Sequence, residues 1–251
     1  MWWAGSERVV VYVGATSTCV AAEVATFEVP LAQPAAETTI SAFEAAMKRI
    51  SSDTVRSTRN LDLQLSGALA RPFVFEAIGG LKSSREAQAV AATLAPEATG
   101  LSGPCVVWLD DWMPGQRCVA VAVETWLRDQ IERSVRSHGL KVKAMRPWWS
   151  VAIDAAVSQL ETAPRLLAVE DTDSLTVFTS AAGRYAALTT YAPKADAAHK
   201  RAVVTRAAMT ADVAPEEIAT ASLGEAPTSN GVDVSASRPK LTLVPQVERW
   251  G

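Results

Sequence analysis

The chain has few of the residues that mark secreted, metal-binding or nucleic-acid-binding proteins. It has three widely spaced cysteines and no Cys-x-x-Cys pair, which argues against a disulfide framework and favours reduced thiols. Its formal net charge of −3 argues against a general nucleic-acid partner. No apolar run approaches the ~18 residues that a membrane-spanning helix needs, and we expect no signal peptide at the N-terminus. With 49% hydrophobic and 20% charged residues, the chain is expected to be globular.

Two segments have the same pattern of an apolar strand, a short polar turn and a β-branched strand. One begins at Arg8 and turns at Gly14, and the other begins at Arg165 and turns around Asp171. We expect strands at 8–14 and 18–28 in the first hairpin, and at 165–180 in the second. Because each hairpin opens one half of the chain, the pattern indicates a duplicated α/β protein.

The order of elements between and after the hairpins predicts a mixed α/β protein. Capping boxes predict helices that begin at Ser41 and Ser83, the latter ending before Pro96. Apolar periodicity predicts a helix from Val123 to Val135. The remaining expected elements are strands near 61–65, 73–75, 104–109, 117–123, 140–145, 185–191 and 218–223, and helices near 147–160 and 195–209.

Several segments of the chain, in this order, resemble a known family. Residues 61–71, with Leu65-Ser66 and Arg71, are similar to a segment of the actin-like cytoplasmic subunits of type II secretion and type IV pilus platforms. The block at 118–123, the helix after it and the segment Gly139–Pro147 resemble that family as well, as does the second hairpin. The resemblance covers roughly residues 8–210.

The resemblance implies an actin-like, ribonuclease H-like fold with two duplicated mixed sheets, flanking helices and a truncated second half. In such a fold the two hairpin turns are expected to face each other. We expect residues 1–122 to form the first half with a small inserted subdomain. Residues 123–223 would form the abridged second half, and residues 224–251 a flexible tail with a possible docking strand.

Both hairpin turns depart from the ATP-binding relatives. Relatives carry an Asp two residues before the Gly of the first turn, whereas this chain has Tyr12 before Gly14, and a phenol is a poor substitute for a carboxylate near Mg²⁺. The second turn has Asp171 and Asp173 and no Gly, so its carboxylates would repel phosphate. We therefore expect no enzyme activity, no catalytic residue and no bound cofactor or metal.

Other residues that carry chemistry have simpler interpretations. Glu170, Asp171 and Asp173 would suit a metal site, but a solvated turn has the same composition. Asp110 and Asp111, as neighbours, fit a turn better than a catalytic pair. His138 and His199 are the only histidines, and no motif around them indicates catalysis. The basic residues Lys194, Lys200, Arg201 and Arg206 fit a solvated helix face, or a contact with acidic lipid or an acidic partner.

Partner binding is expected at the groove between the halves and at two further places. Trp148 and Trp149 are adjacent on an expected helix, so one of them should be partly exposed, and exposed tryptophan is frequent at interfaces. Leu241, Leu243 and Val244 alternate like a strand, which suits addition to a sheet edge of a partner or of the chain itself.

The resemblance implies a non-catalytic scaffold or adaptor in the cytoplasm, at the inner face of the inner membrane. It would bind the cytoplasmic segment of an inner-membrane assembly protein and, as a further partner, a secretion ATPase. Membrane association would be peripheral and through the partner, and no nucleic-acid partner is expected. Formation of a homodimer stays open. The alternative is an active actin-like ATPase or sugar-kinase-like enzyme with divergent phosphate loops. A third reading is an adaptor of the same fold outside such machines, for example a division or cytoskeletal anchor.

Overall fold

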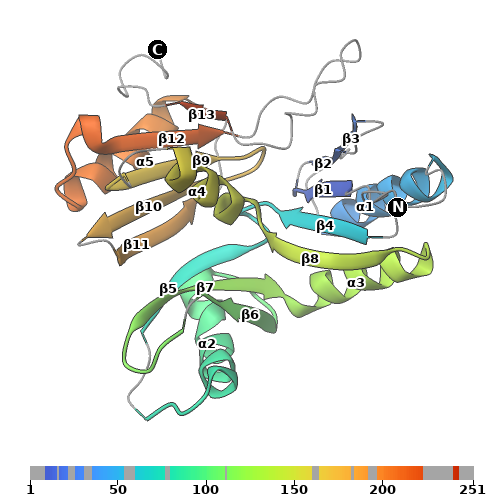
Figure 1. The fold of residues 1–251 in the computed structure, drawn as a ribbon, viewed down its shortest axis with the longest axis horizontal. Helices are drawn as coiled ribbons and strands as arrows, with labels where there is room; N and C mark the ends of the chain where they lie inside the picture. Colours follow the sequence, from blue (N-terminus) through green and yellow to red (C-terminus); the bar gives the residue numbers. More distant parts are fainter. Residues whose placement is uncertain are drawn as a thin grey trace, which may run out of the picture.

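Three β-sheets and five α-helices make up the part of the chain that the computed structural model describes (Figure 1). The described residues are 9–15, 17–21, 26–30, 36–53, 60–76, 80–110, 112–159, 164–181, 184–191, 197–222 and 240–242. None of the helices in these ranges is long and apolar enough to cross a membrane.

The first sheet has five strands in the order β3-β2-β1-β4-β8. Its strands are β1 (Val9–Val13), β2 (Ser17–Ala21), β3 (Thr26–Pro30), β4 (Asn60–Leu65) and β8 (Lys141–Pro147). β1 pairs antiparallel with β2 and parallel with β4, which in turn pairs parallel with β8. The single strand expected at 18–28 is wrong, because β2 and β3 are separate strands that pair antiparallel.

Helices α1 (Ala36–Asp53) and α3 (Thr125–Ser137) pack against each other beside this sheet (Figure 1). Their apolar residues share one core with β1 and β4, as the periodicity of Leu127, Ile131 and Val135 predicts. The expected start of α1 at Ser41 is wrong, because the helix already begins at Ala36. Gly139 ends α3 with a φ of 72°, the left-handed conformation that glycine adopts most readily.

A small subdomain is inserted between β4 and α3. It has a three-stranded sheet in the order β5-β7-β6, made of β5 (Arg71–Glu76), β6 (Cys105–Leu109) and β7 (Arg117–Glu124), with α2 (Ser84–Thr99) on one face. The capping box at the start of α2 is confirmed, because the Glu86 amide donates to Ser83 Oγ at 3.2 Å. The expected end before Pro96 is wrong: the helix continues for one more turn, and Gly100 caps it by donating to the Pro96 carbonyl.

The second sheet repeats the arrangement of four strands of the first, whereas its fifth strand pairs antiparallel where β8 pairs parallel. Its order is β11-β10-β9-β12-β13, with β9 (Leu166–Glu170), β10 (Leu175–Ala181), β11 (Arg184–Tyr191), β12 (Ile218–Ser222) and β13 (Lys240–Thr242). In each sheet three antiparallel strands are followed by a parallel fourth, so that β9 and β12 correspond to β1 and β4. The duplication predicted from the two hairpins is therefore present in the strand order.

Helices α4 (Trp148–Gln159) and α5 (Ala197–Thr210) belong to the second half. α4 lies between the sheets, where it contacts β8 of the first sheet and β9 and β12 of the second. The second half contains no counterpart of the small subdomain among the described residues. α3 and β8 pack with the first sheet, so the expected boundary between residues 122 and 123 lies inside the first half.

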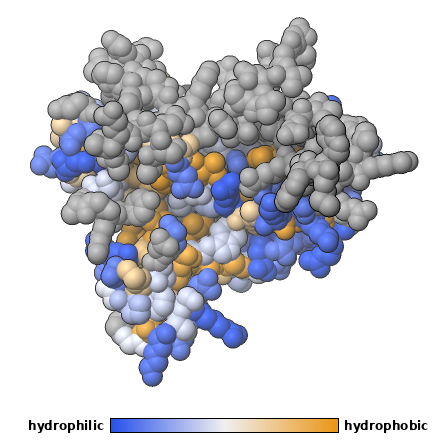
Figure 2. All heavy atoms as spheres, in the orientation of Figure 1, coloured by the Kyte–Doolittle hydropathy of each residue, from blue (hydrophilic) through white to orange (hydrophobic). Residues whose placement is uncertain are grey.

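One hydrophobic core joins the two halves. It extends from β1, β4, α1 and α3 through α4 to residues of the second sheet, including Leu167, Val169 and Phe178. Apolar residues show in the middle of the face drawn in Figure 2, whereas hydrophilic residues cover the region of α3. Because the core is continuous, the halves are packed together and are not joined by a hinge alone.

Candidate functional site between the two hairpin turns

The turns of the two duplicated hairpins face each other across the two halves. Tyr12 at the end of β1 shares a hydrogen bond of 3.0 Å with the Thr172 hydroxyl in the turn between β9 and β10. The amide of Ala15, in the first turn, donates to the Asp173 carboxyl group. The expectation that the turns meet is confirmed, and they meet through direct side-chain contacts.

A second contact between the halves lies just after β4, at Gly67. Its amide donates to Asp171 Oδ2 at 2.9 Å. A Cβ atom at this position would lie 2.5 Å from Ser174 Oγ and 2.7 Å from Thr176 Oγ1, so only glycine fits without movement of its neighbours. Sequence reasoning assigned Gly67 no role; the only available signal was its place directly after a buried strand.

Asp171 organises the second turn from within. Its Oδ1 accepts hydrogen bonds from the Ser174 amide at 2.6 Å and the Asp173 amide at 3.1 Å, and the Ser174 hydroxyl donates to both of its oxygens. These bonds form a turn, as the composition of the segment predicts, but the turn is buried and not solvated as expected. The side chain is buried, and burial raises the pKa of Asp171 although the hydrogen bonds from Gly67 and Ser174 act in the opposite direction.

Asp173 is buried in the same turn as Asp171, and its Oδ1 has no hydrogen-bond partner among the described residues. Burial, followed by the charge of Asp171, raises the pKa of Asp173 to about 7. The amide of Ala15 and the hydroxyl of Ser66 lower it, but by less. The site therefore contains two interacting acids that do not both ionise easily near neutral pH.

Glu170 does not join this pair. It forms a part-buried ion pair with Lys200 of α5, which draws its carboxylate toward the helix. Within the described ranges, no group of three histidine, cysteine, aspartate or glutamate side chains is placed to hold a metal ion. The arrangement of Asp171 and Asp173 is explained by the turn and by the contacts with Ala15 and Gly67.

The two tryptophans expected at a partner interface are buried in the core. Trp148 is 0% and Trp149 is 3% exposed, so the expectation that one would be partly exposed is wrong. Trp149 donates its ring N–H to the Ala70 carbonyl at 3.0 Å, and its ring centre lies 5.4 Å from that of Phe178. Adjacent helical residues can both be buried here because α4 has a sheet on either side.

Of the three tail residues expected to dock, only Leu241 lies in the described part of the chain. It belongs to β13 and pairs with Ala221 of β12, so the strand adds to the edge of the chain's own second sheet. That is one of the two forms of docking predicted from its alternating pattern. Leu243 and Val244 lie outside the described residues.

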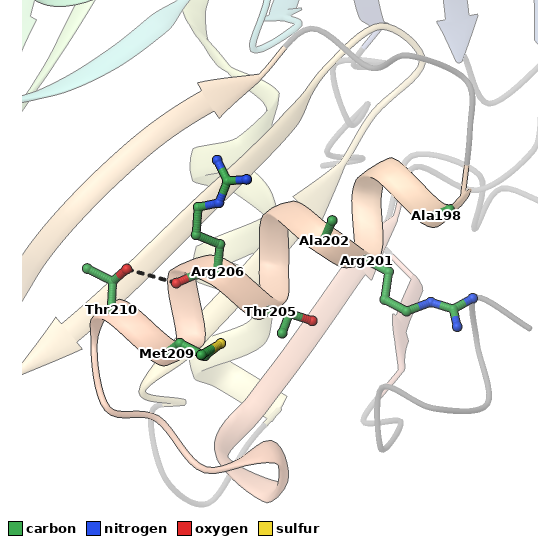
Figure 3. A pocket seen from close by; sticks show the side chains of 7 residues that line it. All are labelled: Ala198, Arg201, Ala202, Thr205, Arg206, Met209 and Thr210. Atoms are coloured by element: carbon green, nitrogen blue, oxygen red, sulfur yellow. Dashed lines mark hydrogen bonds between the residues drawn. The ribbon is translucent and has the colours of Figure 1, made fainter.

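The outer face of α5 contains a shallow depression (Figure 3). It is lined by Ala198, Arg201, Ala202, Thr205, Arg206, Met209 and Thr210, all from the one helix. Arg201 and Arg206 are exposed, as expected for the basic helix, whereas Lys200 pairs with Glu170 and Lys194 lies outside the described residues. No acid, histidine or cysteine lines the depression, so it offers no general base or nucleophile.

The remaining candidates for catalytic chemistry lie outside the two hairpin turns. His138 Nδ1 lies 2.9 Å from the Ser134 carbonyl at the end of α3, and His199 is half-buried on α5. Asp110 is exposed in the connection between β6 and β7, and Asp111 lies outside the described residues. The site between the hairpin turns is thus the one place where buried titratable groups from the described chain join both halves.

Comparison of the coordinates with solved structures identifies the fold. The cytoplasmic domain of EpsL, an inner-membrane component of the type II secretion system of Vibrio cholerae, is similar with a TM-score of 0.50 and 15% identity, over 79% of this chain and 74% of that one. A Bacteroides thetaiotaomicron protein with an actin-like ATPase fold gives a TM-score of 0.56 at 9% identity, over 87% and 82% of the two chains. A chain of the PilM–PilN type IV pilus biogenesis complex gives 0.52 at 13%, over 74% of this chain and 61% of that one.

No protein-family model and no curated protein sequence matches the chain. The chain has the actin-like fold, with an abridged second half, and the resemblance inferred from the sequence is confirmed at the level of the fold. At these identities the similarity establishes architecture, and function has to be argued from the site.

Proposed function

We propose that this chain is a non-catalytic cytoplasmic scaffold of a type IV pilus or type II secretion-like machine. In this role it binds the cytoplasmic segment of an inner-membrane partner. Support comes from the similar solved structures, one an inner-membrane component of a type II secretion system and one a type IV pilus biogenesis complex. Functions on this fold depend on particular residues, so the proposal rests mainly on the site between the turns.

The observation that carries the proposal is the direct contact of the two turns through Asp171 and Asp173. Backbone amides at such turns are natural donors to phosphate oxygens. Here the amides of Ala15 and Gly67 already donate to carboxyl groups of the opposite half. A polyphosphate would have to displace both contacts and would then meet the negative charge of the same carboxyl groups.

The packing around the turns adds to this argument. Gly67 lies so close to Ser174 and Thr176 that even a methyl group does not fit between the halves. Tyr12, at the position where ATP-binding relatives have a carboxylate, uses its hydroxyl to bind Thr172. These contacts favour a body in which the halves are held together for binding other proteins.

Thermal unfolding with and without Mg²⁺ and ATP tests the nucleotide half of the proposal. A ligand that binds the native state raises the unfolding temperature by mass action. We expect no shift at millimolar MgATP and no phosphate release above a protein-free blank. A rise of several degrees, or turnover that a Tyr12→Phe variant abolishes, would favour the ATPase or kinase alternative.

Titration with the cytoplasmic segment of a candidate inner-membrane partner tests the proposed partner binding. We expect binding with the same affinity in the presence and absence of MgATP. A segment of the same composition in scrambled order is the control. Equal binding of both peptides, or of neither, contradicts the scaffold proposal.

A further inference from the structure

We propose that Asp171 and Asp173 share a single proton in the native protein, and that loss of this proton separates the two hairpin turns. The carboxyl pair, as we call these two side chains, would make the contact between the halves sensitive to pH. The inference does not depend on the proposed scaffold function.

The geometry of the pair calls for a proton. Both side chains are buried in one turn, the Asp173 amide donates to Asp171 Oδ1 at 3.1 Å, and Asp173 Oδ1 has no hydrogen-bond partner among the described residues. Two ionised carboxylates in contact repel strongly in a buried site unless a cation or a proton lies between them. Among the described residues, no lysine, arginine or histidine forms an ion pair with either group.

The groups that face the pair come from the first half and from the turn itself, and none is a cation. The first half contributes the amides of Ala15 and Gly67 and the hydroxyl of Ser66. The turn itself contributes the hydroxyl and amide of Ser174. Glu170, the next acid along the chain, is paired with Lys200 of α5.

The hydrogen bonds place the proton on Asp173. Asp171 accepts bonds from three amides and one hydroxyl, an environment that favours its ionised form. Asp173 accepts from the Ala15 amide and has far fewer donors around it. The protonated Asp173 then donates to Asp171, and the raised pKa of Asp173, about 7, agrees with this assignment.

The same two side chains accept the hydrogen bonds from the Ala15 and Gly67 amides of the first half, so ionisation acts on the interface. When Asp173 loses its proton, its hydrogen bond to Asp171 becomes a repulsion between two charges. Separation of the turns exposes both carboxylates to water and so weakens the repulsion between their charges. This separation breaks the bonds to Ala15 and Gly67, which join the halves beside the bond between Tyr12 and Thr172.

The sign of the pH dependence follows from linkage. Between the pKa of Asp173 in the unfolded chain, 3.8, and its native value of about 7, the native state holds one more proton than the unfolded state. The stabilisation is complete below the lower value and is lost as the pH rises toward about 7. Over about pH 5 to 6.5, the unfolding equilibrium constant should rise tenfold per pH unit from this group alone.

Unfolding of the full chain in urea across this pH range tests the proposal with Asp173→Asn. The amide of asparagine still accepts from Ala15 and donates to Asp171, but it cannot titrate. We expect the variant to lose this tenfold slope, while Asp154→Asn, at an exposed position on α4, keeps it. An unchanged slope in Asp173→Asn would overturn the inference.

Two measurements on the wild-type protein do not depend on the folding of a variant. Infrared spectroscopy should show the carbonyl band of a buried protonated carboxylic acid at about pH 6 that fades by about pH 8.5. Hydrogen exchange, corrected for intrinsic rates, should show protection of the Ala15 and Gly67 amides that falls over the same range. Absence of the acid band together with constant protection would refute the shared proton and the separation.

Discussion

A Cβ atom on Gly67 would lie 2.5 Å from the hydroxyl oxygen of Ser174, 107 positions later in the chain. Real Cβ atoms essentially never approach another heavy atom so closely. The two halves of the protein therefore touch at a residue that has no side chain, beside the bond from its amide to Asp171.

Substitution of Gly67 by alanine should weaken the contact between the halves. The added methyl group has to push away Ser174 or Thr176, and overpacking of this kind costs about 1–3 kcal/mol of unfolding free energy. Urea unfolding followed by circular dichroism would measure it. Gly103→Ala is the matched control, because its Cβ would meet only Glu124 Oε1 at an ordinary 3.8 Å. Equal stability of the two variants would show that the halves are not in close contact at Gly67.

Trp149 should contribute to stability and not to partner binding. Trp149→Phe keeps an aromatic ring beside Phe178 but leaves the buried Ala70 carbonyl without its donor. The loss of that bond should cost about 1–3 kcal/mol. Trp126→Phe is the control, since Trp126 is 37% exposed and the hydrogen bond from its ring N–H to Glu124 lies at the surface. A larger effect of Trp149→Phe on partner affinity than on stability would restore the interface interpretation.

Ser83 should stabilise the small subdomain through its cap on α2. Its hydroxyl accepts from the Glu86 amide, and Glu86 in turn accepts from the Lys82 amide. Ser83→Ala should cost about 1 kcal/mol of unfolding free energy. Ser84→Ala, one residue into the same helix, should cost little because alanine is the better helix former. The two variants differ by one position, so a similar loss in both would contradict the cap.

Most of the fold could be predicted from local patterns. The spacing of Leu127 and Ile131 defines α3, because one buried face imposes its period on the sequence. The alternation of Leu61, Leu63 and Leu65 also locates β4, although Asp62 and Gln64 between them are buried as well. The incorrect predictions concern the ends of helices and strands. Pro96 stays inside α2 because packing of the helix on the small sheet outweighs the missing hydrogen bond.

The candidate site could be located from the sequence but its contacts could not. Duplicated hairpins predict that two turns meet, yet nothing local shows that Asp173 reaches the Ala15 amide 158 positions away. The prediction that one tryptophan of α4 is exposed is wrong for a related reason. A helix between two sheets buries opposite sides at once, and sequence adjacency of Trp148 and Trp149 does not reveal the second sheet.

The tail strand β13 should protect the edge of the second sheet. Leu241 pairs with Ala221, and Lys240 pairs with Ser222, so β13 covers the outer edge of β12. A chain that ends at residue 239 should leave this edge unpaired, with faster amide exchange in β12 and more self-association, because an open edge accepts further strands. A chain that ends at residue 242 keeps β13 and should behave like the full protein. If only the loss of residues 243–251 changed the exchange of β12, or if neither truncation did, the strand would not be held on its own sheet, and docking of the tail on a partner would become the better account.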